Sequence, residues 1–384
     1  MSCQKNNRIL VYNDSFFSTS ETFIYYQVQS LSEKYDIDLL GLKFVNPHGY
    51  KIDSFGKCEI NHPENILEKA VSKLYREILN SPLHLTPRSY VRLRDLFKKN
   101  RYSAIHAHFG YNGLNILRHA KKYRVPLVVT FHGYDASMML SDETYKNRLP
   151  ELFDYASAII LVSKHMIENL NLERWLDKVK IIPCTVDPDG FEVREKNSSN
   201  VIRILHSGRL VDKKGVPDLI RVFKNLQDNY DNIELHIVGD GRQLESCKQL
   251  VQKFKLEKRV TFYGAVSHNK VKQILSTTDI FVLNSRVGDD GDMEGTPVTL
   301  LEAMCSKVPV ISTRHAGIPD VIEDRVNGLL VDERDNEGLE EALRTFIENP
   351  EMRQNCSEKA RKTVLENYTV HRMKEKLEQV FQFV

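Results

Sequence analysis

The sequence lacks closely spaced cysteines. Its six cysteines are scattered over 384 residues, with no CxxC pair and no zinc-ligand spacing: Cys3, Cys58, Cys184, Cys247, Cys305 and Cys356. This usage is typical of unpaired thiols in a reducing compartment, and it argues against a disulfide-stapled scaffold.

Long apolar segments are also missing. The longest runs, such as Ala156–Val162, fall far short of the roughly 18–20 residues needed to span a bilayer. The first residues, MSCQKNNRILVYN, lack the profile of a signal peptide. We therefore expect a cytoplasmic protein, with peripheral contact to the inner face of a membrane as an option.

The charge is nearly balanced overall, at +2, but it is unevenly distributed. Residues 88–124 contain ten Lys or Arg and one acid, Asp95. Such a cluster can face phospholipid or another polyanion, or it can be a solvated helix face. Because Val91, Leu93 and Leu96 lie among the cations, one interpretation is a helix on an anionic membrane surface, near a lipid-linked acceptor.

The chain is longer than one hydrophobic core usually organises, so two domains are expected. Short apolar runs alternate with amphipathic helical patterns, which predicts doubly wound parallel sheets in an α/β fold. The expected strands of the first series are Arg8–Tyr12, Ile37–Leu42, Ala104–His106, Leu127–Phe131, Ala158–Val162 and Lys178–Ile182. Those of the second are Ile202–Ser207, Glu234–Val238, Val260–Tyr263, Ile280–Leu283, Pro309–Ser312 and Gly328–Val331.

We expect two facing Rossmann-like domains, residues 1–185 and 186–368, with ligands in the cleft between them. Proline and glycine mark the boundary within Pro183–Ser199. Residues 369–384 have apolar side chains at helical spacing and could pack back on the first domain or on the second.

A basic turn follows the strand Ile202–Ser207. Its sequence is GRLVDKKG, in which Gly208 permits close backbone approach while Arg209 and Lys214 place two cations at a strand end. A departing diphosphate needs such neutralisation, and Arg can grip two phosphate oxygens at once. Taken alone, the motif is equally compatible with a solvated turn.

A helix start follows the strand Ile280–Leu283 and Asn284. In the sequence EGTPVTLLEA, Pro297 suits the first helical turn. The N–H groups of Thr296, Val298 and Thr299 would then face an anion.

Two glutamates, Glu294 and Glu302, flank this helix start eight residues apart. Carboxylates accept hydrogen bonds from vicinal sugar hydroxyls, so one could hold a ribose and the other a transferred sugar. Alternatively Glu294 is a first-turn helix acid and Glu302 is solvated, although the apolar neighbours of Glu302 make that less attractive.

The combined spacing resembles the family-4 retaining glycosyltransferases of GT-B fold. The matching pieces are GR-x(4)-KG, E-x(7)-E and KVPVISTRHAGIPDVIEDRVNGLLV, which span nearly the whole second domain. The resemblance implies that Arg209 and Lys214 contact the donor diphosphate, Glu302 the ribose and Glu294 the transferred sugar. It also implies that the backbone of Gly264–Val266 borders the nucleobase, and that neither metal nor cofactor is needed.

A histidine follows the strand Leu127–Phe131 in the first domain. His132 precedes a glycine and can reach into a cleft, and the resemblance implies that it contacts the transferred sugar. A loop histidine satisfied by backbone is the alternative. Asp135 is a weaker candidate, since it could cap the next turn.

The first strand leads into Ser20-Glu21-Thr22-Phe23, where many relatives have a Gly-Gly loop. This segment resembles a subgroup that assembles exopolysaccharide or colanic-acid-type repeats, although an ordinary helix N-cap would explain it equally well. The segment IHAHFG fits the same subgroup. We expect its His106 and His108 to point to opposite faces of their strand, and therefore expect no metal site there.

Asp289-Asp290-Gly291-Asp292 contains a D-x-D pattern that elsewhere holds a divalent metal. Because it lies beside a helix start already served by two cations, we expect a loop here and no metal. The expected catalytic residues are His132, Glu294, Arg209 and Lys214. The expected donor-binding residues are Ser20, Glu21, Thr22, Gly208, Gly264, Asn284, Gly295, Thr296, Pro297, Val298, Thr299 and Glu302.

The sequence therefore predicts a retaining, metal-independent glycosyltransferase. Its donor would be a nucleotide-sugar, with UDP-sugar favoured, and its acceptor a glycan or lipid-linked saccharide of cell-surface polysaccharide. One alternative is a nucleotide-sugar 2-epimerase, which shares the GT-B architecture. Another is a noncatalytic polyanion-binding protein using residues 88–124, although no zinc-finger or RNA-module signature is present and nucleic acid is not expected as a partner.

Overall fold

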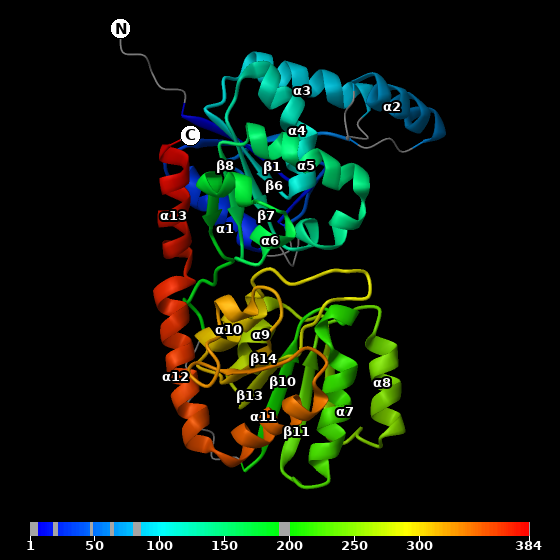
Figure 1. Ribbon diagram of the computed structural model, residues 1–384, viewed down its shortest axis with the longest axis vertical. Helices are drawn as coiled ribbons and strands as arrows, with labels where there is room; N and C mark the ends of the chain where they lie inside the picture. Colours follow the sequence, from blue (N-terminus) through cyan, green and yellow to red (C-terminus); the bar gives the residue numbers. More distant parts are fainter. Residues whose placement is uncertain are drawn as a thin grey trace. The chain divides into compact units, whose positions relative to one another are not determined.

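The structure is a computed structural model that describes residues 7–17, 22–46, 49–61, 65–79, 86–191 and 200–383. The chain forms two compact units (Figure 1). Unit 1 comprises Met1–Ile182 with Met373–Val384, and unit 2 comprises Pro183–Arg372. The chain divides between residues 182 and 183, which is close to the expected boundary between residues 185 and 186.

Unit 1 is built on a seven-stranded parallel sheet in the order β5-β3-β1-β6-β7-β8-β9. Its strands are β1 (Arg8–Tyr12), β3 (Asp36–Gly41), β5 (Gly56–Glu59), β6 (Ala104–His108), β7 (Leu127–Phe131), β8 (Ala158–Leu161) and β9 (Val179–Ile181), and β2 (Ser15–Phe16) pairs separately with β4 (Lys43–Phe44). The strand order reverses beside β1, which is where ligands of open parallel sheets usually bind.

Except for the last one, the described helices of unit 1 lie between these parallel strands along the chain. They are α1 (Thr22–Ser32), α2 (Ile66–Leu79), α3 (Pro87–Lys99), α4 (Gly110–Tyr123), α5 (Glu143–Tyr155), α6 (Met166–Asn169) and, from the end of the chain, α13 (Val370–Gln382). Gly110 starts α4 where a Cβ would lie 2.4 Å from the Phe131 ring, so only glycine fits this close approach. The expected helix at residues 369–384 is α13, and its apolar residues Met373, Leu377, Val380 and Phe381 are buried. Lys34 and Glu378, 2.8 Å apart, tie it to α1 and β3.

Unit 2 contains a six-stranded parallel sheet in the order β12-β11-β10-β13-β14-β15. The strands are β10 (Ile202–Ser207), β11 (Ile233–Val238), β12 (Val260–Gly264), β13 (Ile280–Leu283), β14 (Val310–Thr313) and β15 (Leu329–Val331). The helices are α7 (Val216–Gln227), α8 (Leu244–Lys253), α9 (His268–Leu275), α10 (Val298–Cys305), α11 (Asn336–Glu348) and α12 (Pro350–Asn367).

The continuous apolar runs of unit 2 supply both faces of its sheet. Side chains of a strand alternate between faces, so Ile204 of β10 enters one hydrophobic cluster and Leu205 the other. The same division separates Val282 from Phe281 on β13. Four expected strands have their expected bounds, namely β1, β7, β10 and β13, and the others are shifted by one or two residues. The two predicted parallel-sheet α/β domains are therefore confirmed.

Among the described helices, none combines the length and apolar character required to cross a membrane. The cysteines that the structure describes, Cys58, Cys184, Cys247, Cys305 and Cys356, are all free thiols.

Candidate active site

The basic turn after β10 is held by the turn that follows β11. At Gly239, where φ is +131°, a Cβ would lie 1.8 Å from the carbonyl oxygen of Gly208, so glycine is required. The Leu210 N–H also donates to the Asp240 carbonyl at 2.9 Å. These contacts set the path of the backbone that carries Arg209, which is exposed, and Lys214, which is buried.

Lys214 and Glu294 form a buried ion pair. Their Nζ and Oε1 atoms are 2.7 Å apart, and each side chain is less than a tenth exposed. Ser285 Oγ donates to the same Oε1 at 3.1 Å. Burial alone would raise the pKa of Glu294, but the ammonium groups of Lys214 and Lys213 outweigh it and lower that pKa to about 2. Burial lowers the pKa of Lys214, an effect that Glu294 opposes.

Two buried polar atoms of unit 2, His206 Nε2 and Thr299 Oγ1, have no hydrogen-bond partner among the described residues. His206 Nδ1 lies 3.2 Å from the Val282 carbonyl, to which it donates, so Nε2 bears the lone pair of a neutral ring. Burial lowers the pKa of His206 to about 3. Thr299 lies in the first turn of α10, where backbone N–H groups lack intrahelical acceptors. The free N–H groups at this helix start suit an anionic ligand, whereas the lone pair of His206 Nε2 suits a ligand group that donates a hydrogen bond.

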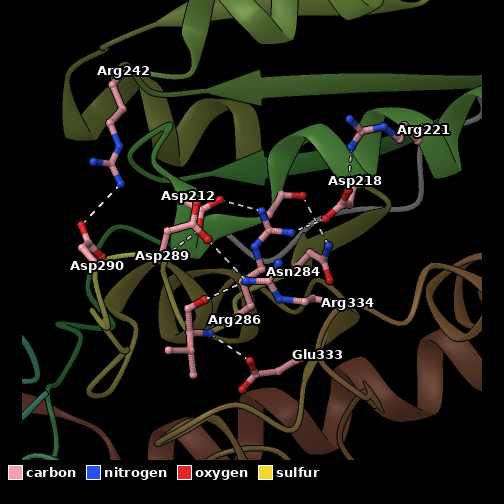
Figure 2. Close-up of polar contacts among 12 residues, drawn as sticks. Asp212, Asp218, Arg221, Arg242, Asn284, Arg286, Asp289, Asp290, Glu333 and Arg334 are labelled. Carbon is pink, nitrogen blue, oxygen red and sulfur yellow. Dashed lines mark hydrogen bonds and ion pairs between the residues drawn. The ribbon is translucent and has the colours of Figure 1, made fainter. Parts of the chain in front are cut away.

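The loop of residues 286–293 leads to Glu294 and is fixed by Arg286 (Figure 2). The Arg286 guanidinium contacts Asp212 at 2.6 Å and also pairs with Asp218. Asp212 in turn accepts from the Asp289 N–H at 3.0 Å. Because Asp212 starts the 3-10 turn η4 (Asp212–Lys214), this contact joins the loop before Glu294 to the turn that ends in Lys214.

The D-x-D pattern lies in this loop, and each of its carboxylates faces a cation. Asp289 is 3.7 Å from Arg334, Asp290 is 3.4 Å from Arg242, and Asp292 is 2.8 Å from Lys213. Figure 2 shows Asp289 and Asp290 on this loop. Arg242, which lies just before α8, donates to Asp290. Within the described ranges, no group of three or more His, Cys, Asp or Glu is placed to hold a metal ion.

A histidine that the sequence interpretation had not singled out fixes the backbone of Glu294. The Glu294 N–H donates to His315 Nε2 at 3.1 Å, so the ring proton is on Nδ1, which donates to Glu333 at 2.6 Å. Glu333 also accepts from the Val287 N–H at 2.9 Å, at the other end of the loop. His315 lies within the quoted segment STRHAG, but its sequence position alone carries no sign of this contact.

Glu302 lies on α10 among fully buried apolar residues and is 7% exposed. Its Oε1 atom is 2.8 Å from His268 Nε2, at the start of α9. The remaining expected donor residues of unit 2 lie at the ends of strands or at the start of α10. Gly208 follows β10, Gly264 ends β12 with φ +66°, Asn284 follows β13, Gly295 and Thr296 are buried, Pro297 is the N-cap of α10 and Val298 is its first residue.

In unit 1, three histidines lie together, with His106 and His108 fully buried and His132 partly buried. The expectation that His106 and His108 point to opposite faces was wrong, because residues two apart on a strand share a face. Their ring centroids are 4.3 Å apart, and His108 Nδ1 is 3.2 Å from His132 Nε2. Burial lowers the pKa of His106 and His132 to about 3, and that of His108 well below its usual value.

Asp135 shapes the loop that carries His132. Its carboxylate accepts hydrogen bonds from the backbone N–H groups of His132 at 2.9 Å, Gly133 at 3.2 Å and Gly110 at 2.8 Å. Burial raises the pKa of Asp135 to about 6, although those hydrogen bonds act to lower it. The His132 ring lies against Phe23 of α1, with centroids 4.7 Å apart. Thr22 is the first residue of α1, while Ser20 and Glu21 lie outside the described residues.

Replacing Arg286 by Ala should destabilise unit 2 by about 3–5 kcal/mol, because the buried Asp212 loses its cation. Arg221 is a matched control, since it contacts Asp218 at 2.6 Å from an exposed position. Its replacement by Ala should cost less than about 1 kcal/mol. Denaturant unfolding of the two variants measures the difference. Equal losses in the free energy of unfolding would contradict the conclusion that Arg286 holds Asp212 in place.

The pH dependence of stability should reflect the buried histidines. The folded-state pKa of His106 lies below the unfolded one, so the unfolded chain takes up its proton first as the pH falls. The stabilisation is complete above about pH 6.5 and is lost progressively below it. His106→Gln should therefore lose stability less steeply between pH 7 and 5, by up to about 1.4 kcal/mol per pH unit. Unfolding of unit 1 at several pH values tests this, and parallel curves for both proteins would refute it.

Two protein-family descriptions match the chain in succession. Residues 20–189 match Glycosyltransferase Family 4, and residues 191–363 match Glycosyl transferases group 1. Among curated proteins, the chain is 33% identical to the amylovoran biosynthesis glycosyltransferase AmsK of Erwinia amylovora, over 60% of this chain and 58% of the relative. It is 31% identical to a putative colanic acid biosynthesis glycosyltransferase of Escherichia coli K12, over 62% and 60%. The matches thus span about three fifths of the length of these relatives.

Solved structures resemble the whole chain at low sequence identity. Anabaena HepE, in complex with UDP and glucose, has a TM-score of 0.78 at 16% identity and covers 98% of this chain and 100% of its own. Sucrose-phosphate synthase from Thermosynechococcus elongatus has a TM-score of 0.77 at 16% identity, covering 98% of each chain. These neighbours show a GT-B fold. The chain therefore consists of a Glycosyltransferase Family 4 domain followed by a glycosyl transferases group 1 domain.

Proposed function

We propose that this protein is a retaining glycosyltransferase of exopolysaccharide biosynthesis. It would move a sugar from a nucleotide-sugar to a hydroxyl of a glycan or lipid-linked saccharide. The observation that carries the proposal is the buried Lys214–Glu294 pair at the carboxyl end of β10, with Glu302 on the adjoining helix. The names of the relatives, amylovoran and colanic acid biosynthesis glycosyltransferases, support the product class. HepE was solved with UDP-glucose, which supports a UDP-sugar donor.

In the proposed mechanism, the donor diphosphate binds to Arg209, Lys214 and the first-turn N–H groups of α10. Lys214 is suited to this role because it lies in a buried setting, where a cation interacts more strongly with an anion than in water. The same groups neutralise the charge that grows on the diphosphate as the glycosidic bond breaks, so we propose that no metal is required.

Glu302 would hold the ribose hydroxyls, and Glu294 would contact the transferred sugar. Glu294 is held as an ionised acceptor, since its pKa is lowered to about 2. The acceptor hydroxyl would attack from the side that the leaving group departs, giving up its proton to a phosphate oxygen. Attack from that same side retains the anomeric configuration.

The alternatives are not favoured. Both family descriptions that match the chain are glycosyltransferase descriptions, and neither describes a 2-epimerase. A noncatalytic polyanion-binding protein would leave the Lys214–Glu294 pair and the carboxylate on α10 without a role.

Glu302→Ala and Lys214→Ala should each lower kcat/KM by about 100-fold or more, because each removes a group that binds the donor in the transition state. The release of nucleoside diphosphate from UDP-, GDP- and ADP-sugars, with and without glycan acceptors, measures the effect. Glu245→Ala is the matched control, since Glu245 is an exposed carboxylate of the same unit, paired with Lys248 on α8. Near-normal turnover by either active-site variant would sink the proposal.

We further propose that unit 1 contacts an anionic membrane surface through residues 88–124 and the adjacent helix α2. All ten cations of residues 88–124 are exposed. On α2, which contacts α3, Ile66 is 87% exposed and Leu67 is 75% exposed. Exposed apolar side chains next to cations are the combination that binds anionic lipid surfaces.

Replacing both Ile66 and Leu67 by Asp should weaken binding to vesicles containing phosphatidylglycerol by about tenfold, because insertion is lost and negative charge is added. Co-sedimentation with phosphatidylglycerol vesicles measures the effect, with pure phosphatidylcholine vesicles as the low-affinity reference. Val287→Asp, at a partly exposed apolar residue of unit 2, should leave vesicle binding unchanged. The membrane assignment is wrong if the wild-type protein does not co-sediment with either kind of vesicle.

A further inference from the structure

The contact between His268 and Glu302 connects α9 and α10 within unit 2. His268 Nε2 lies 2.8 Å from Glu302 Oε1, and the two side chains are 34% and 10% exposed. A carboxylate only accepts hydrogen bonds, so the ring hydrogen is on Nε2 and points at Glu302. Among the described residues, this is the side-chain hydrogen bond that the Glu302 carboxylate makes.

The contact leaves most of the accepting capacity of Glu302 available. A carboxylate has about four lone-pair positions, and His268 uses one of them. Both lone pairs of the other oxygen, Oε2, and the second lone pair of Oε1 are left to accept hydrogen bonds. Two vicinal hydroxyls need two such positions side by side. The carboxylate therefore retains what a ribose 2′,3′-diol requires, provided that its plane is held still.

His268 is itself held by its place at a helix start and by the ring of Phe191, which Lys272 covers in turn. It is the first residue of α9, whose N-cap Ser267 accepts from the Lys270 N–H at 3.3 Å. Its ring meets the ring of Phe191 edge to face, with centroids 5.9 Å apart. The ammonium of Lys272 covers Phe191 at 4.5 Å from the ring centroid and donates to the Asp189 carbonyl at 3.4 Å. The donor to Glu302 is thus fixed before any ligand binds.

We propose that His268 is a specificity-determining residue that orients Glu302 for the ribose diol, so that the site selects ribonucleotides over 2′-deoxyribonucleotides. This inference rests on the proposed function, in which Glu302 binds the ribose. A glutamate has three side-chain torsions, and fixing them beforehand lowers the entropy lost when the diol binds. The benefit depends on the diol, so a nucleotide without the 2′-hydroxyl gains much less from it.

The experiment compares UDP, GDP and ADP with their 2′-deoxy counterparts by isothermal titration calorimetry, and continues with the base that binds most tightly. His268→Ala should weaken ribonucleotide binding about tenfold and leave 2′-deoxynucleotide binding within about twofold. His268→Gln, which keeps an N–H donor, should recover part of the loss. Asn269→Ala, the exposed neighbour on α9, should change neither affinity.

Glu302→Gln separates the inference from the function on which it rests. It should reduce the preference for ribose, and adding His268→Ala to it should cause little further loss, since the two residues act through one contact. Equal losses for both nucleotides in His268→Ala, or a gain for the ribonucleotide, would overturn the role of His268 while Glu302 keeps its own. If Glu302→Gln leaves the preference unchanged, or the wild-type protein binds none of the nucleotides, the ribose assignment fails and this inference fails with it.

Discussion

The buried pair of Lys214 and Glu294 is the interaction on which the rest of the site depends. A buried ion pair is costly to form, because both charges lose their hydration, and it persists only where further hydrogen bonds hold both partners. In unit 2 those supports are present around Glu294. Ser285 donates to its carboxylate, and His315 accepts from its backbone N–H. The geometry is therefore determined before a donor arrives.

The supports also join segments that are distant along the chain. Arg286 connects the loop before Glu294 to Asp212, which begins the turn that ends in Lys214. Glu333, which follows β15, accepts hydrogen bonds from the Val287 N–H and from His315, and so joins its own loop to the loops after β13 and β14. Parallel strands place all of these loops at the carboxyl edge of one sheet, so the hydrogen bonds between them are short-range in space although long-range in sequence.

Unit 1 contains a cluster of neutral imidazoles where the site of unit 2 contains charged pairs. Burial holds His106, His108 and His132 in the uncharged form, as the lowered pKa values show. A neutral ring has one N–H group, so the hydrogen bond between His108 and His132 couples their tautomers, because one ring must donate and the other accept. Asp135 binds three backbone N–H groups and thereby fixes the loop independently of that choice.

Periodicity and motif spacing were enough to predict two parallel-sheet domains, with their expected strands placed to within one or two residues, because buried parallel strands and the turns that end them leave local patterns. The same local patterns drew attention to Lys214, Glu294 and Glu302. The contacts of His315 with Glu294 and of His268 with Glu302 were not predictable, because they form only through tertiary packing. The same is true of the contact between Arg286 and Asp212. The D-x-D loop illustrates the same limit, because nothing in its sequence shows that each carboxylate faces a cation from elsewhere. The amino-acid sequence by itself determined which residue types end each strand. The tertiary structure decided which of them touch, because those contacts depend on neighbouring strands that are far apart in the chain.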